Sequence, residues 1–202
     1  MYIPQINEMT DIHEITDFMK RFSFAAIVSA QDNLPVATHL PFVVAAKDSE
    51  IKLYSHFAKA NPQWKNIDAV KVLVIFSEPH AYISPTNYDE FLSVPTWNYV
   101  AVHVYGQVKI ISEQDEVLSL LENTIGNYES SYKSRWNELP QDFKEKMTDE
   151  IVAFEVTVSD VQAKKKLSQN KTKQEREKII NALSKSANGS EQLTAEYMRK
   201  LY

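Results

Sequence analysis

Strand-length apolar segments recur at short spacing along this chain, and they constrain its fold more than any other feature of the sequence. Phe24–Ala30 has the pattern of a buried strand, Gln31-Asp32-Asn33 that of a hairpin turn, and Leu34–Ala46 that of a long partner strand. Further strands are predicted over 51–57, 70–76, 80–84, 97–111 and 151–158. Helices fall between some strands rather than after each of them, which favours an antiparallel barrel with decorating helices over a parallel sheet. The predicted fold class is therefore mainly β with α.

The helical segments carry recognisable start signals. Thr10 can cap an amphipathic helix over 11–22, and Asn61-Pro62 opens a short helix over 61–67. Further helices are predicted from Ser112 onwards and over 142–150, 174–185 and 191–201.

Prolines and one glycine mark irregular places in the predicted strands. Pro35 and Pro41 lie inside the segment 34–46, and because proline lacks a backbone N–H, they indicate a sheet edge or a bulge. Gly106 marks a bulge or a bend in the long strand 97–111. The segment 88–95 has no periodicity and is predicted to be a loop.

Composition limits the chemistry that the chain can support. The 202 residues are enough for one full core, so a single compact domain with appendages is expected. The three glycines lie too far apart for a glycine-rich phosphate loop, and the lack of cysteine excludes disulfides, thiolate metal sites and a cysteine nucleophile. No apolar run is long enough to span a membrane, and the first residues do not resemble a secretory signal. We therefore expect a cytoplasmic protein with no membrane partner.

Charge is distributed unevenly along the chain. The formal net charge is −5, but the window 163–185 holds eight basic and two acidic residues, which gives it +6 and leaves −11 for the remainder. One interpretation is a solvated helix face beside a basic turn. The other is a contact with phosphate or nucleic acid, although the acidic remainder would repel a duplex.

Two common classes of catalytic site are disfavoured. The five histidines form no closely spaced pair, and there is no cysteine to complete a ligand set, so no metal site is expected. The Gly-x-Ser-x-Gly motif of hydrolases is absent as well. No catalytic residue is assigned.

Four clusters of polar and aromatic residues lie at the ends of predicted strands. They are Thr38–Phe42, Tyr54–Trp64, Val94–Tyr99 and Lys166–Lys171. In the second cluster a strand runs into a helix start, where hydroxyl, imidazole and ammonium groups lie beside backbone N–H groups without helical partners. Together the clusters offer charge neutralisation, stacking and hydrogen bonds to a ring edge. A phosphorylated planar heterocycle such as flavin mononucleotide (FMN) requires these groups.

Several of the same segments carry a family resemblance. They are Met1–Pro4, His39-Leu40-Pro41, His56–Trp64, Pro79–Pro85, Val94–Tyr99 and Lys166–Asn170. With them, the chain resembles the PaiB family of FMN-binding negative transcriptional regulators over about residues 1–185. The resemblance implies a split β-barrel of the pyridoxamine-phosphate-oxidase-like kind with peripheral helices, and a homodimer with FMN at the interface between two protomers. It also implies an FMN-binding split-barrel domain over 1–162 and a basic, helical extension over 163–202 that packs on the same domain.

Position within such a barrel implies a role for individual residues. Ser55, His56 and Lys59 match the place that holds the flavin phosphate, and Asn61 opens the helix that follows. His39 and Leu40 match residues that border the isoalloxazine ring. The resemblance further implies that the site is closed, from the same or the partner chain, by Thr96, Trp97, Asn98, Ser168 and Gln169.

Three functions remain open at this point. The first is a flavin-binding regulator with DNA as an optional partner, although no helix-turn-helix pattern with a recognition helix is present. The second is an FMN-dependent oxidoreductase or flavin reductase, in which the cofactor carries the electrons. The third is a haem-binding barrel, with an axial ligand from His39, His56, His80 or His103.

Overall fold

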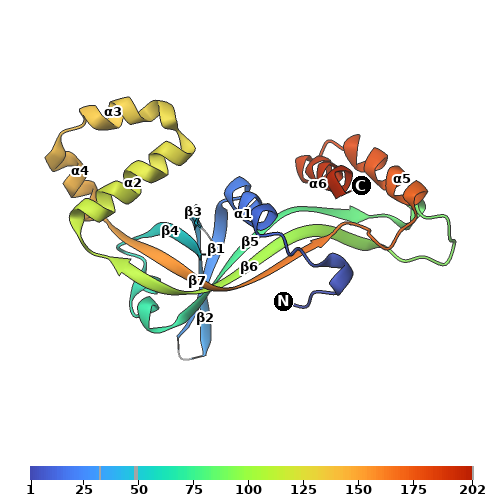
Figure 1. Ribbon diagram of the computed structural model, residues 1–202, viewed down its shortest axis with the longest axis horizontal. Coiled ribbons are helices and arrows are strands. Elements are labelled where there is room, and N and C mark those ends of the chain that lie inside the picture. Colours follow the sequence, from blue (N-terminus) through green and yellow to red (C-terminus); the bar gives the residue numbers. More distant parts are fainter. Residues whose placement is uncertain (32, 48–49, 202) are drawn as a thin grey trace. The chain divides into compact units, whose positions relative to one another are not determined.

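The computed structural model describes residues 1–31, 33–47 and 50–201, which form two compact units (Figure 1). The barrel unit comprises residues 16–76 and 103–161. The terminal unit comprises residues 1–15, 77–102 and 162–202 and contains both chain ends. Asp32, in the predicted hairpin turn, lies outside the described residues. The domain division at residue 162 predicted from the sequence stays a prediction.

In the described part of the chain, seven strands form one sheet. They are β1 (Phe24–Gln31), β2 (Leu34–Pro41), β3 (Val43–Lys47), β4 (Glu50–Ala58), β5 (Lys71–Ile83), β6 (Thr96–Ile111) and β7 (Ile151–Lys166). Their order is β2-β1-β5-β6-β7-β4-β3, and β1 pairs antiparallel with β2 and β5, as β4 does with β3 and β7. The predicted early hairpin and the antiparallel class are confirmed.

The connection between β2 and β3 shows that the sheet closes on itself. These two strands lie at opposite edges of the sheet, yet only Phe42 separates them in the chain. Because one residue spans only a few ångströms, the sheet must curl until its two edges meet. The prediction of one continuous strand over 34–46 was therefore wrong at Phe42, while the prediction that its prolines mark an edge strand is confirmed for Pro35 and Pro41.

Aromatic side chains fill the core of the barrel unit. Phe42, Phe57, Phe76 and Phe154 are completely buried. Phe154 stacks on Phe57 with ring centroids 4.9 Å apart and meets Phe42 edge-on at 6.2 Å. Such offset and edge-to-face pairs add to the free energy gained from burying the rings. Phe42, the residue between the two edge strands, is thus fixed by the core.

The strands β5, β6 and β7 are longer than β1 to β4, and each contains residues of both units. The predicted strands 70–76 and 80–84 are a single strand, β5, which contains Pro79 after a cis peptide bond. The predicted strand 151–158 continues as β7 to Lys166, so Lys164, Lys165 and Lys166 belong to a strand and not to a turn. Lys164 is tolerated there because its ammonium donates to the backbone oxygen of Tyr2 at 3.1 Å and lies 5.2 Å from the centre of the Tyr99 ring.

Gly106 explains how β6 and β7 approach each other. A Cβ at this position would lie 2.5 Å from the backbone oxygen of Thr157 and 2.6 Å from Cγ1 of Val156. Its φ is not positive, so space rather than backbone conformation demands glycine here. The sequence predicted a bulge or a bend at Gly106, and what the structure shows at this position is a close contact between β6 and β7.

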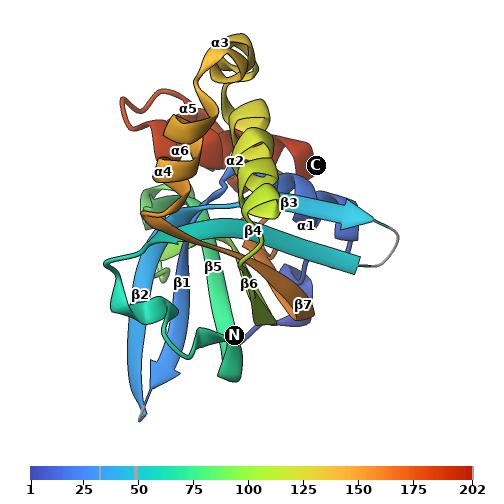
Figure 2. The same ribbon diagram turned by 90° about the vertical axis from the view of Figure 1, so that its left-hand side faces the viewer.

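The helices of the barrel unit lie in the chain before β1 and between β6 and β7. They are α1 (Ile12–Arg21, which begins in the terminal unit), α2 (Gln114–Tyr128), α3 (Lys133–Glu138) and α4 (Gln141–Thr148). Val117 and Leu120 of α2 are buried in one cluster with Ala153 of β7, and α2 lies beside β3 (Figure 2). Short 3₁₀ turns occur at Gln5–Asn7, Pro62–Trp64, Ile67–Ala69, Pro85–Asn87 and Ser130–Tyr132. Asp11, not Thr10 as predicted, caps α1, because its carboxylate accepts from the backbone N–H of His13 at 2.8 Å.

The terminal unit ends in a pair of helices, α5 (Lys173–Ser184) and α6 (Gly189–Leu201), which pack against each other (Figure 1). α5 begins at a capping box, in which Thr172 and Glu175 each accept from the other's backbone N–H. Among the described residues, no helix is both long and apolar enough to cross a lipid bilayer.

Candidate functional site

The predicted phosphate-binding residues of the barrel unit lie on β4 and in the turn that follows it. Ile51, Leu53, Ser55 and Phe57 are buried, and the residues between them are half-buried, so adjacent side chains point to opposite faces of the strand. Ser55 and His56 therefore cannot both face one ligand by their side chains. The Ser55 hydroxyl is buried and donates to the backbone oxygen of Pro41 at 2.7 Å, which ties β4 to the end of β2.

The same alternation separates the two predicted ring contacts on β2. Leu40 is buried, whereas His39 is exposed and stacks on Phe24, with ring centroids 6.1 Å apart. Only one of these two side chains can border the ring on a given face of the strand.

The turn after β4 is a 3₁₀ turn and not the predicted short helix. Pro62–Trp64 forms one such turn and Ile67–Ala69 another, and between them Asn66 has a φ of 63°. The Asn61 side chain caps the first turn by accepting from the backbone N–H of Gln63 at 2.9 Å, and the N–H of Asn61 bonds to the backbone oxygen of Ala58. Since these N–H groups are already satisfied, the backbone of this turn offers less to an anion than a helix start would.

A buried glutamine fixes this turn on the neighbouring strands. The Gln63 amide nitrogen lies 3.1 Å from the backbone oxygens of Ile27 on β1 and Val36 on β2, and its oxygen accepts from the Thr38 hydroxyl at 2.6 Å. Thr38 in turn accepts from the Asn61 amide at 2.9 Å. No role for Gln63 or Thr38 is predicted from the sequence. Their partners come from three separate segments, so no local pattern could have revealed the network.

Lys59 is the cation that this scaffold holds in place. Its backbone N–H donates to the oxygen of Glu150 at 2.8 Å, and its backbone oxygen accepts from the indole N–H of Trp64 at 2.9 Å. The ammonium group has no ion-pair or hydrogen-bond partner within the described ranges. Lys59 and Trp64 line a cavity of about 350 Å³, whose lining also includes Asp149. A fixed backbone with an unpaired ammonium suits the recognition of an anion.

His56 is half-buried, and this burial lowers the pKa of its imidazole below the ordinary value of about 6.5. The imidazole is therefore neutral at pH 7, with one nitrogen that donates and one that accepts a hydrogen bond.

The predicted residues of the terminal unit separate into two groups. Asn98 and Ser168 are buried and bonded to each other: the Asn98 amide donates to the Ser168 hydroxyl at 2.9 Å and also lies 3.5 Å from the sulfur of Met198. Thr96, Asn98 and Ser168 line one cavity of about 360 Å³, here termed the terminal cavity. Trp97 points elsewhere, because it is 53% exposed and packs beside Tyr82 and His80.

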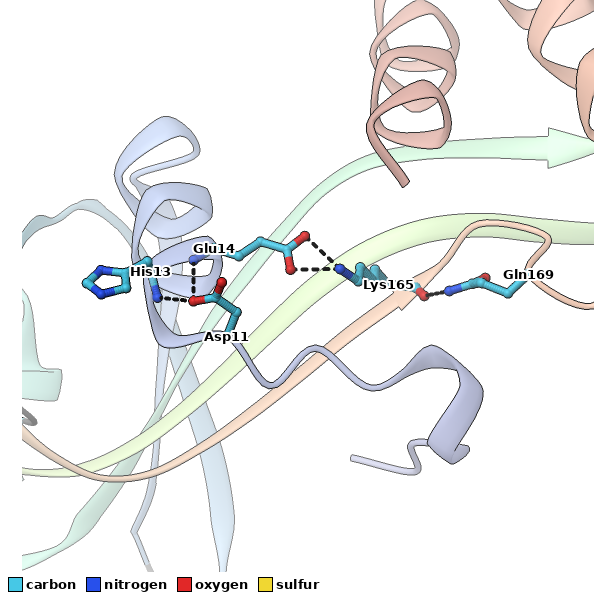
Figure 3. Close-up of polar contacts among 5 residues, drawn as sticks. All are labelled: Asp11, His13, Glu14, Lys165 and Gln169. Atoms are coloured by element: carbon cyan, nitrogen blue, oxygen red, sulfur yellow. Dashed lines mark hydrogen bonds and ion pairs between the residues drawn. The ribbon is translucent and has the colours of Figure 1, made fainter. Parts of the chain in front are cut away.

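Gln169 stabilises the turn that carries Ser168. Its side chain accepts from the backbone N–H of Leu167 at 2.6 Å and donates to the backbone oxygen of Lys165 at 2.5 Å (Figure 3). Ser168 has a φ of 61°, in the left-handed region that few residues other than glycine adopt. Gln169 thus acts on the backbone of this turn, and its amide is already satisfied.

Most cations of the basic window are bound within the terminal unit. Lys165 pairs with Glu14 at 2.7 Å (Figure 3), and Lys178 pairs with Asp89 at 2.5 Å. Lys166 donates to the hydroxyl of Thr96, and Lys164 is buried. The window therefore does not present one continuous basic face to a duplex.

Comparison with known proteins identifies close sequence relatives. Residues 1–160 match the family model described as "Putative FMN-binding domain". The chain is 38% identical over 201 residues to the protein from Bacillus subtilis named "Protease synthase and sporulation protein PAI 2", and the alignment covers 98% of this chain and 96% of that protein. PAI 2 is PaiB, so the resemblance predicted from the motifs is confirmed.

Solved structures with low sequence identity share the fold. The flavocytochrome Anf3 from Azotobacter vinelandii has a TM-score of 0.62 at 13% identity, covering 82% of this chain and 72% of that chain. The FAD and haem binding protein from Mycobacterium smegmatis has a TM-score of 0.59 at 14% identity, covering 79% of this chain and 73% of that chain. These likenesses confirm the predicted split-barrel fold class, mainly β with helices.

Proposed function

Since this chain belongs to the FMN-binding family that includes PAI 2, we propose that it is a flavin-dependent regulatory protein, which binds FMN as a homodimer in the cytoplasm. FMN as the cofactor is confirmed at the level of the family. The regulatory role, the dimer and the individual contacts are the proposal. The observation that carries the proposed site is Lys59, an ammonium without a partner among the described residues on a backbone that is held at both ends.

The donor set of the barrel unit fits the phosphate end of FMN. Lys59 supplies the positive charge, and the network around Gln63 fixes the turn that carries it. Ser55, another predicted phosphate contact, and Asn61, which was predicted to open the following helix, already have intramolecular partners, so they position the strand end and the turn. His56 supplies a neutral imidazole.

The ring of the flavin requires a second surface. On the outer face of β1 and β2, His39 and Phe24 form an exposed stacked pair, which is the kind of surface against which a planar ring packs. A second copy of the chain would cover the other side of the ring. The assignment of Thr96, Trp97, Asn98, Ser168 and Gln169 to the flavin stays a prediction.

FMN supplies a ring that accepts and donates electrons. This chain would contribute binding and orientation: Lys59 neutralises the phosphate, and the neutral His56 offers one donor and one acceptor. The pairing of the basic window with Glu14 and Asp89 favours a regulator that acts through flavin-dependent contacts with other molecules over one that grips DNA through this segment.

The phosphate contact can be tested by titrating FMN and riboflavin into Lys59→Ala, with Lys71→Ala as a matched exposed lysine. Loss of one charge-assisted hydrogen bond, about 1.5–3 kcal/mol, should raise the Kd for FMN roughly 10- to 100-fold. Riboflavin, which lacks the phosphate, should bind both variants and the wild type alike. Equal FMN affinity for Lys59→Ala and the wild type would refute the assignment.

The regulatory role calls for a second measurement, binding of the protein to duplex DNA at low salt with FMN present and absent. We expect no salt-dependent binding through the basic window. Tight, salt-dependent binding that Lys173→Ala and Lys178→Ala weaken would show that the segment does contact DNA.

A further inference from the structure

The terminal cavity has the features of a ligand site, and it lies outside the flavin contacts proposed on the barrel unit. It has a volume of about 360 Å³, within the range of small-molecule pockets. Its lining comes from the 88–95 loop, from Thr96 and Asn98 of β6, from Lys166 at the end of β7 and from the turn 168–171. All of these residues belong to the terminal unit.

Two lysines give the cavity a positive charge. The Lys171 ammonium lies 3.5 Å from the centre of the Tyr88 ring, and Lys166 donates to the hydroxyl of Thr96. Within the part of the chain that the structure describes, neither lysine has a carboxylate at ion-pair distance, in contrast to Lys165 and Lys178 in the same segment. Glu90 also lines the cavity, so its charged side chains sum to +1.

A buried hydroxyl in the lining lacks a partner. Tyr88 is 8% exposed, and its hydroxyl is the buried side-chain atom that has no hydrogen-bond partner among the described residues. Burial raises the pKa of this phenol, so it remains a donor at neutral pH. Buried polar groups normally have partners, and an orphaned one in a pocket wall indicates an acceptor that comes from elsewhere.

Part of the lining of the cavity is apolar and open to water. Leu92 and Val94 are 90% and 77% exposed, and Pro95 follows them in the loop. An apolar ligand body would remove part of this surface from water.

From these observations we propose that the terminal cavity binds a small organic carboxylate with an apolar body. The carboxylate accepts from Lys171, Lys166 and the Tyr88 hydroxyl, and the apolar body lies against Leu92 and Val94. A net lining charge of +1 matches a monoanion better than a phosphate group, which carries about −1.5 to −2 near neutral pH. The site is distinct from the flavin contacts proposed on the barrel unit, and this proposal assigns it to a substrate or an effector in place of the predicted flavin contacts of Thr96, Asn98 and Ser168.

In the test, benzoate is the probe and benzamide is its isosteric neutral control. Binding of each is measured from the chemical shifts of the labelled full-length protein, with and without saturating FMN. Benzoate should bind at least tenfold more tightly than benzamide, and Lys171→Gln should weaken benzoate roughly tenfold or more, through loss of a charge-assisted hydrogen bond. Lys173→Gln, an exposed lysine outside the lining, should leave benzoate binding unchanged.

Tyr88→Phe separates a binding role from a structural one. The variant removes a hydroxyl that has no partner among the described residues, so the thermal stability of the protein should not decrease. Its affinity for benzoate should decrease. Equal binding of benzoate and benzamide, unchanged benzoate affinity in Lys171→Gln, or tighter binding of inorganic phosphate than of benzoate would each overturn the proposal. Displacement of benzoate by FMN would assign the cavity to the cofactor instead. Failure of FMN to bind at all would refute the proposed function and leave the benzoate result standing.

Discussion

Gly106 provides a sharp test of the barrel. In Gly106→Ala the added methyl carbon would lie 2.5 Å from the backbone oxygen of Thr157 and 2.6 Å from Cγ1 of Val156. A side-chain end can move aside, but the Thr157 oxygen belongs to the backbone of β7, so relief requires β6 and β7 to separate locally. Overpacking of this kind costs about 1–3 kcal/mol. For a chain of this size the melting temperature should fall by roughly 2–12 °C.

Gly126→Ala is the matched control, because nothing lies within 4 Å of a Cβ at that position in α2. Alanine favours a helix over glycine by up to about 1 kcal/mol, so this variant should melt at the same or a slightly higher temperature. Both melts would be followed by circular dichroism on protein without flavin. A Gly106→Ala variant as stable as the wild type would refute the close approach of the two strands.

Two further outcomes follow from the same structure. In chemical denaturation, Gln63→Leu should lower the free energy of unfolding by at least about 1–3 kcal/mol, because the backbone oxygens of Ile27 on β1 and Val36 on β2 lose their donor. Gln174→Leu, on the exposed face of α5, should have little effect. Similar free energies of unfolding for the two variants would contradict the role of the network. The free energy of unfolding should decrease as the pH falls below about 6.5, because burial lowers the pKa of His56 in the folded protein and the unfolded chain therefore takes up the proton first. His56→Gln should show a shallower decrease over that range, and a profile identical to that of the wild type would exclude this contribution.

The sequence predicted those parts of the fold that depend on local pattern. The hairpin β1–β2 and the strand β4 follow from apolar alternation and turn residues. The break at Phe42 was not predictable, because it reflects closure of the barrel around a shared aromatic core. The end of β7 was not predicted, because three consecutive lysines are unusual in a strand. Lys164 is accommodated there because its ammonium lies over the rings of Tyr2 and Tyr99, which are distant in the sequence.

The candidate site shows the same division. The motifs placed Asn98 and Ser168 in one predicted site, and the two side chains are hydrogen-bonded in the structure although seventy positions separate them in the chain; their contact with the flavin stays a prediction. Within a single motif, however, the sequence grouped His39 with Leu40 and Ser55 with His56, and strand alternation places the members of each pair on opposite faces. The orphaned hydroxyl of Tyr88 and the ammonium of Lys171 could not be recognised in advance, because their significance depends on which partners they lack in three dimensions.

The central claim is that this chain holds FMN, and the absorption spectrum of the protein tests it most directly. The protein is incubated with excess FMN, freed of unbound flavin by gel filtration, and its spectrum is recorded beside that of Lys59→Ala treated in the same way. We expect flavin bands that stay with the wild-type protein and are reduced in the variant. A spectrum without flavin bands, or one with the Soret band of a haem in protein purified without additions, would contradict the account.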